Sequence, residues 1–205
     1  MCCRRESDTS DWIDENCGCL VNEADPDNPV ISIGTFSKII APGLRLGWMY
    51  SSPDHIKTIK QEGVVNSGGG VNQISSQIVH QFILQGYLDS HLLRLRQIFS
   101  WRVKILSETI SSLFPPTFTH FAPSGGYFIW LTFPEGVIWT NEIAEYAKNK
   151  ESLIVPAGSR FNMASTTLFT NSVRLSFAFH TATELELGIR KLKIVLHHFY
   201  PSAFE

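Results

Sequence analysis

A regular apolar stripe from residue 88 to residue 113 limits the possible folds more than any other feature of this sequence. Apolar side chains recur there every three or four residues, and charged side chains avoid their face. The spacing predicts one long amphipathic helix, which Pro115 and Pro116 end because proline cannot continue a helix. We expect this helix to bridge a first α/β layer and a C-terminal α/β unit. The stripe consists of Leu88, Leu92, Leu95, Phe99, Val103, Leu106, Ile110 and Leu113.

Strand and helix patterns alternate on both sides of this helix. Period-two and β-branched runs predict strands at residues 30–34, 45–51, 125–133 and 172–179, and a short one from Ser152 that Pro156 stops. Helical spacing predicts helices at residues 52–60, 74–85, 140–150 and 181–199. Thr140 is in an N-cap position, and Thr181 with Glu184 has capping-box spacing. The order of elements therefore indicates an α/β protein.

Composition excludes several classes of protein. The 205 residues are 43% hydrophobic and 18% charged, with a formal net charge of −2, which disfavours a disordered chain or an electrostatic nucleic-acid binder. The apolar runs are shorter than the roughly 20 residues that a membrane span needs, and the N-terminus has no apolar signal core. We expect a cytoplasmic protein without nucleic-acid or membrane partners. A mitochondrial location stays open, although Arg4 and Arg5 are too few for a presequence.

The four cysteines all lie near the N-terminus, at Cys2, Cys3, Cys17 and Cys19. This position disfavours a disulfide framework for the fold. Their spacing lacks the loop of structural zinc sites and no histidine lies nearby, so we expect a reduced N-terminal segment and no metal, with a zinc site as the alternative. The sequence assigns them no further role.

The run GTFSKIIAPGLRLGW, residues 34–48, forms the loop between the first two predicted strands. Loops that follow strands commonly place ligand-binding groups in α/β proteins. The hydroxyls of Thr35 and Ser37 and the guanidinium of Arg45 are suited to hold a phosphate, and Lys38 can form a Schiff base with an aldehyde. A solvated surface lysine is the alternative.

This run resembles the pyridoxal-phosphate lysine motif of the class I/II aminotransferases of fold type I, especially the 2-aminoadipate and kynurenine aminotransferases. It matches at every diagnostic position except Thr35, where serine is more usual and a hydroxyl is retained. The resemblance implies that Lys38 carries the cofactor as a Schiff base and moves a proton between the substrate Cα and the cofactor C4′. It also implies that Thr35, Ser37 and Arg45 hold the phosphate.

Two later segments are similar to the same family. NSVRLSFA, residues 171–178, resembles the late strand whose arginine binds the substrate α-carboxylate, which gives Arg174 that role; an edge-strand arginine paired with a local glutamate is the alternative. PSGGYFIWL, residues 123–131, resembles a strand of the small domain, and we expect its aromatic side chains in the core. The glycine-rich loop at residues 67–70 is either an interface segment or a flexible turn, and it lacks a nucleotide P-loop pattern.

The resemblance implies the C-terminal half of the fold type I architecture of pyridoxal-phosphate-dependent transferases. We expect an irregular segment at 1–29, a partial large domain with the bridging helix at 30–114, and a small α/β domain at 115–205. The implied function is amino-group transfer between an α-amino acid and a 2-oxo acid. The implied assembly is a homodimer or a pairing with a full-length homologue.

The family's pyridine-binding aspartate and tyrosine precede the lysine, where this chain has Asp8 and Asp11 but no tyrosine. We therefore expect a truncated family member whose own activity is open. The alternatives are a non-catalytic fragment or partner subunit, and another fold type I enzyme such as a β-lyase or a cyclopropane-carboxylate synthase. The sequence does not identify the substrate side chain.

Overall fold

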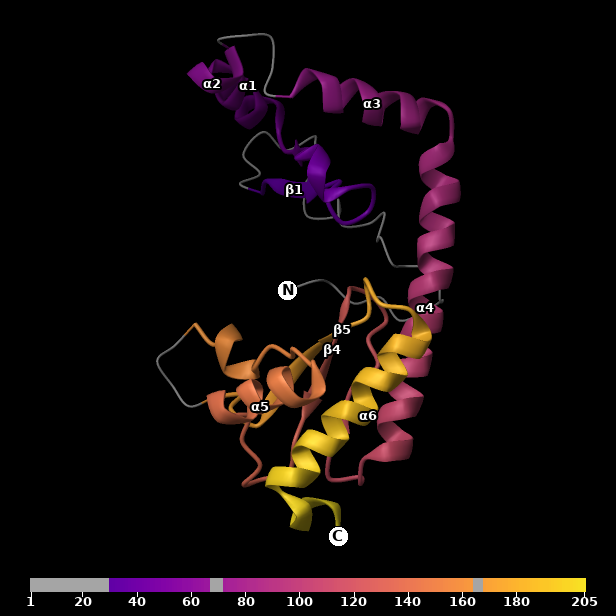
Figure 1. The fold of residues 1–205 in the computed structure, drawn as a ribbon. Helices are drawn as coiled ribbons and strands as arrows, with labels where there is room; N and C mark the ends of the chain where they lie inside the picture. Colours follow the sequence, from indigo (N-terminus) through magenta and orange to yellow (C-terminus); the bar gives the residue numbers. More distant parts are fainter. Residues whose placement is uncertain (1–29, 67–71, 164–167) are drawn as a thin grey trace. The chain divides into compact units, whose positions relative to one another are not determined.

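The structure is a computed structural model that describes residues 30–66, 72–163 and 168–205. It divides into two compact units, residues 1–96 and 97–205, and Figure 1 labels their helices and some of their strands. The four cysteines, the segment at 1–29 and the glycine-rich loop at 67–70 lie outside the described residues. The predicted division into segments 1–29, 30–114 and 115–205 stays a prediction.

The first unit contains a β-hairpin followed by helices. Strands β1 (Ser32–Thr35) and β2 (Gly47–Tyr50) form where the two strand patterns predicted them, and they pair antiparallel. Gly34 faces Trp48 across the pair, and a Cβ on Gly34 would overlap the Trp48 ring, so this position requires glycine. The helices are α1 (Pro53–Gln61), α2 (Gly63–Asn66) and α3 (Gln73–Leu84).

Most apolar side chains of the first unit are exposed. Within residues 30–66 and 72–96, Val79 is the only buried apolar side chain. Helix α3 forms where the sequence predicted it, but Ile74 and Ile78, on the expected apolar face, are 79% and 53% exposed. The described part of this unit supplies too few side chains to cover that face.

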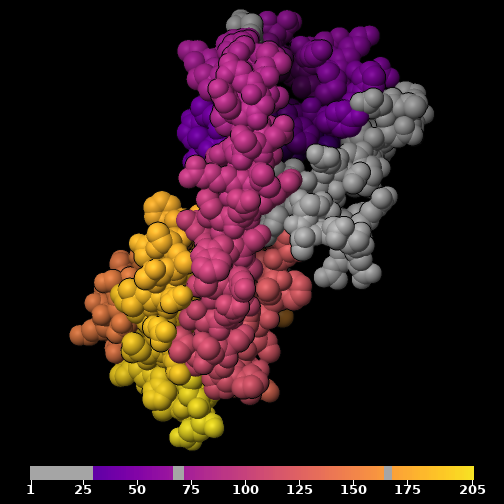
Figure 2. Space-filling view, turned by 90° about the vertical axis from the view of Figure 1, so that its right-hand side faces the viewer, coloured from indigo at the N-terminus to yellow at the C-terminus, as the bar shows by residue number. Residues whose placement is uncertain are grey.

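Helix α4 (Tyr87–Leu113) confirms the predicted long helix. Phe99, Val103, Leu106 and Ile110 are buried at steps of three or four residues, and the helix ends before Pro115. Figures 1 and 2 show helix α6 (Ala182–Phe199) beside the C-terminal part of α4. Across the described ranges, no helix has the length and apolarity that a membrane span requires.

The second unit is built on an antiparallel sheet in the order β3 (Thr119–His120), β4 (Phe128–Thr132), β5 (Ser172–Ser176). Side chains alternate between its faces, so Ile129, Leu131, Val173 and Leu175 form a buried face. The other face carries Phe128, Trp130 and Arg174. The prediction that the aromatic side chains of β4 lie in the core is therefore wrong for Phe128, which is 42% exposed, and Trp130 is only half-buried.

The helices of this unit begin where the sequence predicted. Thr140 caps α5 (Asn141–Glu151) by accepting a hydrogen bond of 3.3 Å from Ile143 N. Thr181 and Glu184 form a complete capping box at α6, in which Thr181 N donates to Glu184 Oε2 at 2.8 Å. The hydrogen bond from the Thr181 backbone lowers the pKa of Glu184, and the hydrogen bond from the Thr181 side chain lowers it further.

The predicted strand at Ser152 is wrong. Helix α5 ends with Ser152 in the left-handed region at φ 52°, and the chain then follows β5 with one isolated bridge, Ala157 to Val173. Arg174 N donates to Pro156 O at 3.1 Å, but Pro156 has no N–H to donate in return. Strand β3 and three short 3-10 turns, η2 (Pro42–Leu44), η3 (Gly158–Phe161) and η4 (Pro201–Phe204), were not predicted.

We expect His120 on β3 to make the stability of the second unit sensitive to pH. Its Nε2 lies 2.7 Å from Ser107 Oγ of α4, and burial lowers its pKa. The unfolded chain therefore binds a proton at this histidine more readily than the folded chain, so stability is full above the unfolded pKa and falls as the pH drops below about 6.5. Urea unfolding at pH 7.5 and pH 5 should show a larger loss for the parent than for His120→Gln. His80→Gln, at an exposed position of α3, is the control and should keep the parent's pH dependence.

Candidate cofactor and substrate site

Lys38 lies on a closed loop between β1 and β2. Phe36 N donates to Leu46 O at 3.0 Å and closes the loop across its base. Ile40 N donates to Phe36 O at 2.8 Å, so residues 37–40 form one turn that carries Lys38. The Lys38 side chain is exposed, which leaves its amine accessible to a ligand.

The structure brings together two of the predicted phosphate ligands. Thr35 Oγ1 donates to Ser37 Oγ at 3.0 Å, and Ser37 N donates to Thr35 Oγ1 at 3.1 Å. This local turn places the two hydroxyls side by side at the start of the Lys38 loop. Both can rotate to donate to a small anion.

Arg45 lies at the other end of the same loop with a positive φ of 49°. Its exposed side chain donates from Nη1 to Pro42 O at 3.2 Å. Few residues other than glycine adopt this backbone region, and such conformations persist where neighbouring contacts hold them. Asn72 supplies such contacts, since its Nδ2 donates to Leu44 O at 2.8 Å and lies 3.4 Å from Arg45 O.

Two residues that anchor the loop were missed by sequence reasoning. Asn72 is also the N-cap of α3, where its side chain accepts from Ser75 N at 3.4 Å. His91 of α4 donates from Nε2 to Ile39 O at 2.8 Å. An asparagine directly before a helical pattern signals an N-cap and could have identified Asn72. Nothing in the sequence signals the His91 contact.

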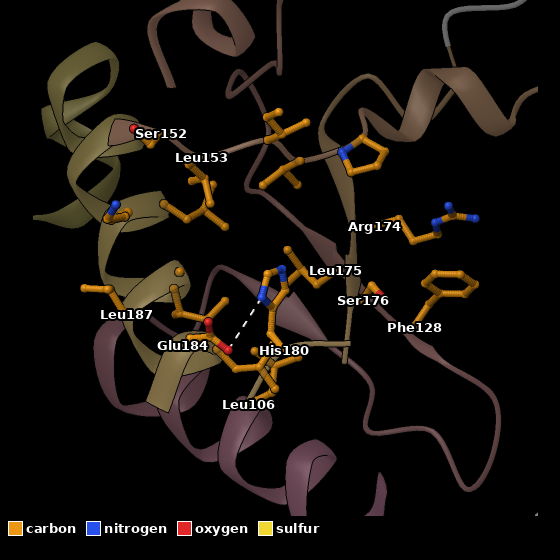
Figure 3. Close-up of a pocket in the computed structure, with 18 residues that line it drawn as sticks. Leu106, Phe128, Ser152, Leu153, Arg174, Leu175, Ser176, His180, Glu184 and Leu187 are labelled. Carbon is orange, nitrogen blue, oxygen red and sulfur yellow. Dashed lines mark ion pairs between the residues drawn. The ribbon is translucent and has the colours of Figure 1, made fainter. Parts of the chain in front are cut away.

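Arg174 belongs to the second unit and lies on β5 opposite Trp130. Its guanidinium carbon is 3.9 Å from the ring centroid of Phe128 and 4.1 Å from that of Phe161, and Figure 3 shows Arg174 beside Phe128. Its Nε is buried and has no hydrogen-bond partner within the described residues. The ion pairs found among those residues are Lys104–Glu108 and His180–Glu184, so Arg174 does not form the ion pair with a local glutamate that was its alternative role.

A cavity of about 520 Å³ lies between α6, β5 and residues 152–156. Figure 3 shows its lining, with the His180–Glu184 pair at one end and Arg174 at the edge. Its walls are mostly apolar, including Leu153, Leu187 and Leu192. Lys191, also in the lining, donates to Glu151 O at 2.6 Å at the end of α5.

Comparison with known families finds a match that covers both segments. The family model described as "Aminotransferase class I and II" matches residues 9–192. The chain belongs to this family. The match includes the Lys38 loop and Arg174, so both lie within the part that the family shares.

The aminotransferases that resemble the chain are about twice as long or longer. It is 30% identical over 171 residues to Aromatic-amino-acid aminotransferase 1 of Thermococcus litoralis, a match that covers 82% of this chain and 39% of that protein. It is 27% identical to the HTH-type transcriptional regulator NorG of Staphylococcus aureus, covering 80% of this chain and 35% of that protein. The chain thus spans about two fifths of the length of these relatives.

Solved aminotransferase structures also match the chain over part of their length. One is the kynurenine aminotransferase of Pyrococcus horikoshii, which was solved in complex with PMP, KYN as substrates and KYA as products. It matches with a TM-score of 0.73 and 27% identity, over 85% of this chain and 42% of that chain. The multiple substrate aminotransferase of Thermococcus profundus has the same TM-score and identity, over 84% of this chain and 42% of that one. The mixed α/β structure is therefore part of the aminotransferase fold.

Proposed function

We propose that the chain takes part in pyridoxal-phosphate-dependent amino transfer between an α-amino acid and a 2-oxo acid. Family membership supports this reaction class. The observation that carries the proposal is the Lys38 loop, because one closed segment presents an exposed amine, two adjacent hydroxyls and an exposed guanidinium. The cytoplasmic location stays a prediction, and the sequence does not identify the substrate side chain.

The chemistry of the loop fits the two ends of pyridoxal phosphate. Thr35 and Ser37 offer hydroxyl donors, and Arg45 offers a fork of N–H groups that matches phosphate oxygens. Lys38 offers the primary amine that an aldehyde requires. When bound, the cofactor supplies an aldehyde and a ring that withdraws electrons from the substrate Cα.

Each residue has a separate part in the proposed reaction. Lys38 would hold the cofactor through its Nζ amine, and the same amine, when free, would take a proton from the substrate Cα. Arg174 binds the substrate α-carboxylate, since its guanidinium can form two parallel hydrogen bonds with that group. Thr35, Ser37 and Arg45 keep the phosphate in place throughout.

A comparison of two aldehydes tests the phosphate-binding part of the proposal. We expect the purified chain to develop a visible absorption band with pyridoxal phosphate and to bind pyridoxal, which lacks the phosphate, at least tenfold more weakly. Arg45→Asn should weaken pyridoxal phosphate binding by about tenfold or more, because a charge-assisted hydrogen bond is lost, and should leave pyridoxal binding unchanged. Asparagine tolerates the positive φ of this position, so the loop should persist.

Arg160→Asn is the matched control, because Arg160 is exposed and lies in the other unit. It should bind both aldehydes as the parent does. Equal affinity for the two aldehydes, or equal effects of the two substitutions, would contradict the assignment of a phosphate site.

A non-catalytic partner subunit is the second candidate function. It is favoured by the exposed apolar side chains of the first unit, among them Ile33 and Val64, which are 75% and 74% exposed. The chain is also similar to NorG, which is named as a transcriptional regulator and not as an enzyme. In this case the chain pairs with a full-length homologue. The chain would then bind neither aldehyde in the comparison above, and size-exclusion chromatography would still find it folded.

A further inference from the structure

The two rings that contact Arg174 come from opposite sides of β5. Phe128 lies on β4, which pairs with β5 so that Trp130 faces Arg174. Phe161 ends η3, which follows the bridge from Ala157 to Val173 on the other side of β5. The side chain of Arg174 therefore projects between two segments that each contribute one phenylalanine.

Both rings are close enough to fix the guanidinium. Its carbon lies 3.9 Å from the centroid of Phe128 and 4.1 Å from that of Phe161, well within the range of about 6 Å for cation–π contacts. Arg174 Nε is buried and makes no hydrogen bond to the described residues. The contacts with the two rings, rather than hydrogen bonds from Nε, therefore orient the Arg174 guanidinium.

Tight packing holds Phe161 in place. Gly158, at the start of η3, lies so close to the chain that an added Cβ would come within 2.6 Å of Phe169 O and 2.9 Å of both Ser172 O and Trp130 Cζ2. The Trp130 ring meets the Phe161 ring edge-on at 5.9 Å and the Phe169 ring at 5.5 Å. Glycine at this position thus lets η3 pack closely enough for Phe161 to reach Arg174.

We propose that Phe128 and Phe161 form an aromatic clamp that positions Arg174 for a planar carboxylate. This inference rests on the proposed role of Arg174 in binding the α-carboxylate. The rings cover the guanidinium, so its N–H edge is the part left for a ligand, and a carboxylate in the same plane can accept two parallel hydrogen bonds. An arginine that is already ordered loses less conformational freedom on binding, which raises affinity. Phe128 and Phe161 are positioning residues and need no contact with the substrate.

Nuclear magnetic resonance of the 15N-labelled chain tests the clamp directly. The side-chain Nε–Hε signal of Arg174 is assigned by its loss in Arg174→Lys, and we expect ring currents to shift it upfield of the other arginine signals. Phe161→Leu and Phe128→Leu should each move this signal downfield. Phe179→Leu is the matched control, because Phe179 is 87% exposed, and it should leave the signal in place.

Titration with pyruvate, a simple 2-oxo acid, then tests the positioning role. We expect Phe161→Leu and Phe128→Leu each to weaken pyruvate binding by about threefold to tenfold, which is the usual cost of ordering one long side chain on binding. Arg174→Lys should weaken it by more than about tenfold because the bidentate fork is lost. Phe179→Leu should bind as the parent does.

The outcomes distinguish a failure of the clamp from a failure of the proposed function. An Arg174 signal without an upfield shift overturns the clamp. The positioning role is overturned if Arg174→Lys weakens pyruvate binding while both leucine variants bind as tightly as the parent. If the parent does not bind pyruvate, or if Arg174→Lys binds it equally well, the carboxylate role of Arg174 fails, and the positioning role fails with it.

Discussion

Replacing Lys38 with alanine is expected to abolish the attachment of pyridoxal phosphate that borohydride makes permanent. Reduction fixes the cofactor only where a primary amine has joined its aldehyde, and in the proposed site Lys38 is that amine. We expect mass spectrometry to find the parent labelled on Lys38 and labelling of the whole chain to fall by more than about 100-fold in Lys38→Ala. Stability should stay within about 0.5 kcal/mol of the parent, because the side chain is exposed.

Two further variants distinguish the amine from its charge. Lys38→Arg keeps a cation but has no primary amine, so it too should lose the label while retaining phosphate attraction. Lys57→Ala, on α1 of the same unit, should be labelled as the parent is. Persistent labelling of Lys38→Ala, or a label that maps to Lys57, would show that attachment is unspecific and that the loop is not the cofactor site.

Replacing Phe177 with alanine is expected to reduce the free energy of unfolding by about 3 to 5 kcal/mol, the usual cost of removing a buried phenylalanine. Phe177 is fully buried, and its ring meets that of Phe99 at 6.1 Å. Its carbonyl and that of Ala178 accept hydrogen bonds from Arg102 Nη1, at 3.3 Å and 2.6 Å. The side chain therefore lies where the end of β5 joins α4, and a cavity there would weaken both packing and hydrogen bonding.

Urea unfolding followed by circular dichroism measures this loss, and Phe179→Ala is its control. Phe179 lies two residues further along the chain and is 87% exposed, so the same truncation should change stability by less than about 0.5 kcal/mol. Similar losses for the two variants would mean that the end of β5 is not packed as described.

Local patterns predicted most of the elements. The apolar stripe identified α4 because its spacing is sustained over many turns, and the Thr181–Glu184 capping box fixed the start of α6. The strand predicted at Ser152 failed because its apolar run does not reveal the left-handed Ser152 or the single bridge at Ala157. A strand depends on pairing with distant residues, which a local pattern does not contain.

The candidate site was predictable only in part. Thr35, Ser37, Lys38 and Arg45 lie within one short segment, so their shared loop follows from the sequence. The rings around Arg174 could not be found in this way, since Phe128 and Phe161 come from separate segments and meet it only through the sheet. An aromatic strand favours the core in general, and nothing local marks Phe128 as the exposed member.

The exposure of Thr35, Lys38 and Arg45 also bears on how this gene can change over generations. Substitutions of exposed side chains usually have small effects on folding, so selection for a stable protein constrains these three side chains only weakly. Gly158 differs, because any larger residue there meets neighbouring backbone. If the loop no longer binds a cofactor, its charged and hydroxyl side chains are free to drift, whereas the packing beneath Arg174 stays constrained by folding alone.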